Sequence, residues 1–217
     1  MYARLLATFG LLCVSTSMGW SESALPAGSE VEVYLKGDTS SPGILAEVNR
    51  ELGALMQHAG FNIVWRHADD PSSSSGAEHL IVVELRGTCA LTSANESFGP
   101  LGSSPALASS AVVDGRVLPF SWVDCTALNR FLRPAIANLP APEQDYIFGR
   151  AMARLLAHEF YHVLAQTDDH TQAGISKARF STADLLAEHF DFAPTALEKL
   201  RVPSSGSASD DGSVGGR

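Results

Sequence analysis

Apolar and polar residues alternate with two different periods in the first half of the chain. The stretch VEVYLKG, 31–37, alternates at every second position, as a strand with one buried face does. Between 41 and 60 the apolar residues recur at intervals of three and four, which predicts a helix. FNIVWR, 61–66, predicts a second strand. HLIVVELRG, 79–87, predicts a third, and its nearly continuous apolar run favours a central place in a sheet.

The second half is organised around one turn signal and one long helical pattern. Residues 88–110 hold no period. Asp114-Gly115 then stands between two apolar runs and predicts a hairpin over 111–118, because a type I′ turn needs positive φ at both central positions. Helical patterns follow over 142–166 and near 181–190. The order of elements predicts an α/β (α+β) fold with a mixed sheet of four to five strands, an edge hairpin, a long helix and a small helical C-terminal part.

The two ends of the chain differ from the middle. Arg4 precedes an apolar run from Leu5 to Val14 and then small residues, the pattern of a signal peptide over 1–19. Its removal would leave a protein without stable membrane insertion; an uncleaved anchor or a buried N-terminal helix is the alternative. We expect one domain over 20–202, followed by a disordered Ser/Gly/Asp tail over 203–217.

Export changes the meaning of the three cysteines. Removing the signal peptide removes Cys13 and leaves Cys89 and Cys125, an even pair in an oxidising compartment. The sequence therefore predicts a disulfide in a secreted or periplasmic protein, with two buried free thiols as the alternative.

Composition excludes one class of partner. Hydrophobic residues make up 45% of the 217, which is enough for a real core, and the net charge is −9. A nucleic-acid-binding protein needs a basic face, so we expect no nucleic-acid partner.

The candidate chemistry lies in HEFYH, 158–162, within the long helical pattern. His158 and His162 are four residues apart, so they share one helix face and can reach one zinc ion at about 2.0–2.1 Å. Glu159 flanks that face without joining the coordination, where its carboxylate can act as a general base toward a water that the metal acidifies. Phe160 and Tyr161 point mostly the other way, into the core.

A catalytic zinc needs a third protein ligand, and His170 is the leading candidate. In a continuous helix His170 would lie about 12 Å beyond His162, too far to share the metal. The helix must therefore end near Gln166 or Thr167 and the chain must turn back, which TDDHTQAG favours through its Thr and Asp residues and its glycine.

Other polar residues offer alternative or supporting roles. Glu188 is the alternative third ligand, and His189 beside it is then a candidate to polarise the substrate carbonyl. Asp168 or Asp169 is a candidate to orient a histidine, although each is individually more typical of a solvated loop.

HEFYH-x7-H followed by Gly174-Ile175 resembles a family of predicted secreted bacterial zincin-like zinc metalloproteases. The resemblance implies a zincin-like fold, zinc ligation by the three histidines and Glu159 as catalytic base. Two features depart from related patterns: Ser176 stands where the family usually has Met, and the metzincin pattern places its third histidine closer. Phe180 corresponds to an aromatic residue that the family usually has a little further on.

These observations lead to the hypothesis of a secreted endopeptidase with one Zn²⁺ per chain and a peptide or protein substrate. Tyr146, Tyr161 and His189 are its candidate oxyanion stabilisers, and the 111–118 hairpin offers an edge strand for an extended peptide. The alternatives are a secreted binding or envelope protein with a structural metal or no metal, and a metallohydrolase that does not act on peptides.

Overall fold

The computed structural model describes residues 28–37, 41–67, 77–90 and 106–201. The predicted signal peptide and the predicted C-terminal tail lie outside the described residues.

Five strands form one mixed sheet in the order β2-β1-β3-β5-β4. The neighbouring pairs β2–β1, β1–β3 and β3–β5 are parallel, and β4 is antiparallel to β5. This confirms the predicted fold class, with the strand–helix–strand start, the edge hairpin and the long helix. The elements are β1 (Ser29–Lys36), α1 (Pro42–Ala59), β2 (Phe61–His67), β3 (His79–Arg86), β4 (Ala108–Val113), β5 (Arg116–Asp124), α2 (Cys125–Ile136), α3 (Ala141–Ala165), α4 (Thr182–Leu186) and α5 (Pro194–Arg201).

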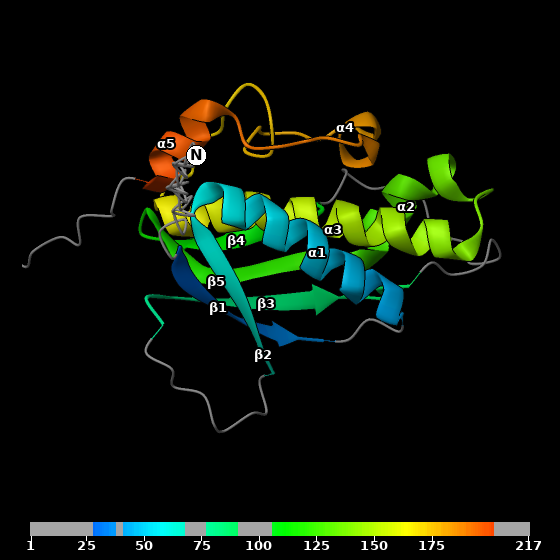
Figure 1. Ribbon diagram of the computed structural model, residues 1–217, viewed down its shortest axis with the longest axis horizontal. Coiled ribbons are helices and arrows are strands. Elements are labelled where there is room, and N and C mark those ends of the chain that lie inside the picture. Colours follow the sequence, from blue (N-terminus) through cyan, green and yellow to red (C-terminus); the bar gives the residue numbers. More distant parts are fainter. Residues whose placement is uncertain (1–27, 38–40, 68–76, 91–105, 202–217) are drawn as a thin grey trace, which may run out of the picture.

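The sheet, a pair of helices and the C-terminal segment form successive layers. Figure 1 shows α1 and α3 side by side over one face of the sheet, with α4, α5 and the chain between them over α3. β3 is the middle strand, as its apolar run predicted, and its Ile81 and Val83 are fully buried. Leu80, on the other face, is 46% exposed. The core therefore lies between the sheet and the two helices. In the part of the chain that the structure describes, no helix has the length and apolar character to cross a membrane.

The hairpin and the helix termini follow the local signals in the sequence. Asp114 and Gly115 have φ of 50° and 74°, as the predicted turn between β4 and β5 requires. Gly60 ends α1 in the left-handed conformation, with φ of 96°. Ser41 precedes α1 but does not cap it through its side chain; its hydroxyl donates to the Asp145 carboxylate of α3, at 2.5 Å.

A disulfide joins Cys89 to Cys125, which confirms the predicted pair. Cys89 follows β3 and Cys125 opens α2 directly after β5, so the bond links the carboxyl ends of two adjacent parallel strands. Both residues are buried. A disulfide of this kind indicates folding in an oxidising compartment.

Close packing of α1 against α3 predicts opposite effects for two Gly-to-Ala substitutions. A Cβ at Gly149 would lie 2.6 Å from the carbonyl oxygen of Ile44, whereas a Cβ at Gly53 would meet nothing within 4 Å. Gly149→Ala should lower the free energy of unfolding by about 1–3 kcal/mol despite the better helix propensity of Ala. Gly53→Ala should raise it by about 0.5–1 kcal/mol. Urea unfolding measures both, and equal effects would contradict this packing.

Removal of the disulfide should destabilise the protein through the unfolded chain. The two cysteines are 36 residues apart. A cross-link closing a loop of that size contributes about 4 kcal/mol in the chain-entropy model, which the Cys89→Ala/Cys125→Ala variant should lose. Urea unfolding measures the loss. As a direct check, denaturing alkylation of unreduced protein should label neither cysteine, and labelling of both would show that the bond is absent.

Candidate metal centre

Four buried polar side chains of α3 recur every four residues. Arg150, Arg154, His158 and His162 are between 0% and 8% exposed. Residues four apart lie one turn above another, so these four form a single slowly turning stripe along the helix. That stripe faces the C-terminal segment, because each of the four side chains hydrogen-bonds a main-chain carbonyl between 167 and 186.

The two histidines of HEFYH are held by main-chain carbonyl oxygens. His158 donates from Nδ1 to the carbonyl of Ile175, and His162 donates from Nδ1 to that of Thr167, each at 2.7 Å. A carbonyl oxygen only accepts, so each ring carries its proton on Nδ1 and keeps a lone pair on Nε2. Partners of this kind fix both the tautomer and the ring plane of a metal-binding histidine.

The two Nε2 atoms face each other 3.0 Å apart. Burial lowers the pKa of His158 to about 4 and also lowers that of His162, so both imidazoles are neutral at neutral pH. Two neutral lone pairs at this distance repel unless a cation lies between them. The spacing is close to the roughly 3.3 Å that separates two nitrogens bound tetrahedrally to one zinc.

His170 completes the group. The ligand atoms of His158, His162 and His170 all lie within 4.8 Å of one another. The His170 ring is stacked on His158, with centroids 5.2 Å apart, and lies edge-on to His162 at 4.8 Å. Phe180 contacts His158 edge-on from another side, at 5.3 Å. Three imidazoles are a donor set that zinc accepts, so the residues present fit the metal.

Gln166 ends α3 where the sequence required it to end. Its φ of 49° is left-handed, and the main chain leaves the helix after Ala165. The Gln166 side-chain amide donates to the carbonyl of Val163 at 2.7 Å and to that of Val117 in β5 at 3.0 Å. This side chain therefore caps a carbonyl at the helix end and ties that end to the sheet, a contact that was not predicted from the sequence.

A turn around Gly174 then returns the chain to α3. Gly174 has φ of 74°, and the amide of Ile175 donates to the carbonyl of Asp191 at 3.0 Å. The carbonyl of Ile175 is thereby presented to His158. Ser176 is fully buried and shares a 2.7 Å hydrogen bond with the Thr171 hydroxyl.

Glu159 lines the same cavity as the three histidines. The cavity has a volume of about 250 Å³, and residues of β4 and β5 form its opposite wall. Burial raises the pKa of the Glu159 carboxyl to about 7, and a hydrogen bond from Ser110 opposes part of the rise. This bond, from Ser110 Oγ to Glu159 Oε2, is 2.7 Å long. A carboxyl with a pKa near neutrality is suited to accept and release a proton.

Several predicted residues lie away from this cavity. Glu188 and His189 are exposed and line a separate depression with His58, because α4 ends at Leu186 and not near 190 as predicted. Glu188 is thus not placed with the histidine group. Of the candidate oxyanion stabilisers, Tyr146 lines that separate depression with His189, and Tyr161 is fully buried in the core with Phe160.

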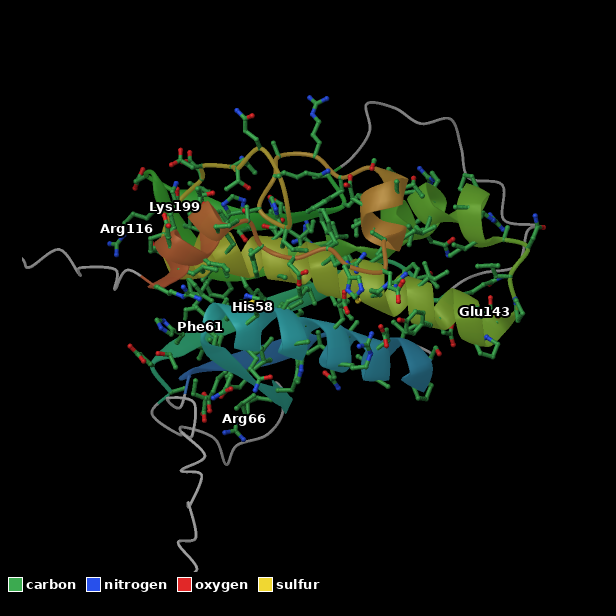
Figure 2. The ribbon with its side chains drawn as sticks, turned by 45° about the horizontal axis from the view of Figure 1, so that its top comes forward. His58, Phe61, Arg66, Arg116, Glu143 and Lys199 are labelled. Carbon is green, nitrogen blue, oxygen red and sulfur yellow. A yellow bond between two sulfur atoms is a disulfide. The ribbon has the colours of Figure 1, made fainter. Side chains whose placement is uncertain are left out.

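The Nδ1 atoms of His158 and His162 are bound to main-chain carbonyls and not to Asp168 or Asp169. Asp169 accepts a hydrogen bond from Lys199 of α5 at 2.7 Å, and Asp168 lies at the cavity wall. Figure 2 shows Lys199 and Arg116 of the hairpin at one end of the molecule, with Glu143 of the first α3 turn at the other. The groups that orient His158 and His162 are therefore main-chain carbonyls. Every residue has a carbonyl, so a sequence does not reveal which one will bind a histidine.

No protein-family model matches the chain, and no curated protein matches it significantly.

Substitution of Gly174 should damage the site without touching a histidine. A Cβ there would lie 2.5 Å from the carbonyl of Asp191, and a non-glycine residue at positive φ costs about 1–2 kcal/mol more. Gly174→Ala should therefore reduce stability and weaken Zn²⁺ binding, because the Ile175 carbonyl is displaced from His158. Calorimetric titration with Zn²⁺ measures the affinity. Gly115→Ala, also at positive φ but with nothing within 4 Å of its Cβ, is the matched control and should leave zinc affinity unchanged.

Proposed function

We propose that this protein is an exported zinc-dependent endopeptidase. The observation that carries the proposal is the convergence of three imidazoles and one buried carboxyl on a single cavity. The ligands would be His158, His162 and His170, with one Zn²⁺ per chain. Zinc held there supplies a Lewis acid that lowers the pKa of water and polarises the scissile carbonyl.

Glu159 is the general base of this proposal. It accepts the proton of the attacking water and later passes that proton to the leaving amine. Its raised pKa supports both steps, because a carboxyl that titrates near neutral pH can exist in either form during turnover. The two ring Nδ1–H groups remain bound to carbonyls throughout and keep the imidazoles in place.

The substrate of the proposal is a peptide or protein segment in extended form. β4 ends the sheet order, so its outer edge is not paired by another described strand. Ala108, Ser109 and Val112 of this strand line the cavity beside Glu159. An extended peptide added to β4 would gain main-chain hydrogen bonds and pass the histidine group. The net charge of −9 supports the absence of nucleic acid among the partners.

The disulfide supports secretion or a periplasmic location for the mature protein. The signal-like residues 1–19 agree with it.

Zinc content and peptide hydrolysis should separate in two variants. Glu159→Gln should keep stoichiometric zinc and lose about 10²–10⁴-fold in kcat on casein or a peptide library, because only the proton acceptor is removed. His162→Ala should lose both zinc and hydrolysis. Elemental analysis and fluorogenic cleavage measure the two properties, and chelation of the wild type should abolish cleavage reversibly. Zinc without hydrolysis in the wild type would favour a structural site, and absence of zinc would overturn the metal site altogether.

A further inference from the structure

Two serines on adjacent strands connect the sheet to Glu159. Ser110 of β4 and Ser121 of β5 are directly paired in the strand register, and their hydroxyl oxygens are 2.9 Å apart. Ser110 Oγ also lies 2.7 Å from Glu159 Oε2 and 3.4 Å from the Glu159 carbonyl oxygen. Ser121 is 3% exposed. The pair therefore forms a line of hydroxyls that runs from the buried Ser121 through the half-buried Ser110 to the carboxyl.

The direction of this line follows from the number of hydrogens. In the ionised form, which is the form that acts as a base, the Glu159 carboxylate only accepts, so the single hydroxyl hydrogen of Ser110 goes to Glu159. The hydrogen between the two serines must then come from Ser121. Ser110 thus donates to Glu159 and accepts from Ser121, and this double engagement fixes its rotamer more tightly than either bond would alone.

The two carboxylate oxygens of Glu159 consequently differ. Oε2 is occupied by Ser110, while Oε1 has no hydrogen bond to any described residue. A carboxyl group can turn about its last side-chain bond, and one strong hydrogen bond removes that freedom. The β4–β5 register shifts between Ser110 and Val112, and an irregularity of this kind is a known means of directing a side chain toward a site.

We propose that Ser110, supported by Ser121, is a positioning residue that holds Glu159 Oε2 so that Oε1 is the oxygen that receives the proton of the attacking water. This role rests on the proposed peptidase function. In this proposal β4 has two roles. Its outer edge would bind the peptide, and Ser110 on the strand would position the Glu159 carboxyl. The register of the bound peptide and the direction of the carboxyl would thus be fixed by one strand.

A double-mutant cycle tests the contact itself in metal-free protein. Ser110→Ala, Glu159→Ala and the double variant are compared by melting temperature. Ser110→Ala should lower the Tm by several degrees in the wild-type background, and by less than half as much when Glu159 is already Ala, because the shared bond is then absent. Equal shifts in the two backgrounds would overturn the proposal without bearing on whether the protein is a peptidase.

Kinetics then separate positioning from general stabilisation. Ser110→Ala should lower kcat about 10- to 100-fold with KM and zinc stoichiometry unchanged, and Ser110→Thr, which keeps the hydroxyl, should restore most of the loss. Ser41→Ala is the matched control, since it removes another Ser-to-carboxylate bond of α3 far from the cavity. It should lower the Tm and leave kcat unchanged.

The outcomes distinguish the two proposals. An unchanged kcat in Ser110→Ala, or equal losses in Ser110→Ala and Ser41→Ala, would overturn the positioning role alone. A zinc-loaded wild type that cleaves no peptide would overturn the proposed function, and the positioning role with it, even where the melting-temperature cycle shows the expected coupling.

Discussion

Hydrogen bonds from one stripe of α3 to main-chain carbonyls hold the C-terminal segment against the helix, and the metal centre depends on them. The segment runs back along α3, so later carbonyls meet earlier side chains. The pairs are His162 with Thr167, His158 with Ile175, Arg154 with Asp184 and Leu185, and Arg150 with Leu186. One four-residue repeat thus provides both the anchors of the segment and the orientation of the ligands.

These hydrogen bonds matter for stability because the side chains that make them are buried, and a buried polar group without a partner costs free energy. Arg154 is fully buried, and an isolated charge there would be costly; an ion pair with Glu51 of α1 at 2.9 Å and two carbonyl acceptors compensate it. Through these contacts Arg154 of α3 is bound both to α1 and to the C-terminal segment. For the histidines, burial acts in the opposite direction: it keeps the rings neutral, and a neutral ring is the form that binds a metal. Burial along this face of α3 therefore has two consequences. Around Arg154 it requires charge-compensating contacts that join the elements, and around the two histidines it maintains the neutral form that binds a metal.

The sequence predicted those parts of the fold and site that local patterns encode, and it failed where a pattern was short or the contact distant. The 142–166 periodicity gave α3, and the need to bring His170 back gave its end at Gln166. The helix predicted over 181–190 stops at Leu186, and α5 over Pro194–Arg201 was not predicted. Helices of five and eight residues carry too few repeats to show a period, and tertiary packing decides their ends.

The sequence by itself determined the alternation that makes the strands, the Asp114-Gly115 turn, and the placement of His158 and His162 on one helix face. Each of these is set by neighbours along the chain. Only the tertiary structure decided which groups orient His158 and His162, because every residue has a carbonyl oxygen and the sequence does not show which of them will lie beside a histidine. It also decided the contact of Ser110 with Glu159, which lies 49 residues later and is reached only through the pairing of β4 with β5 and their packing under α3.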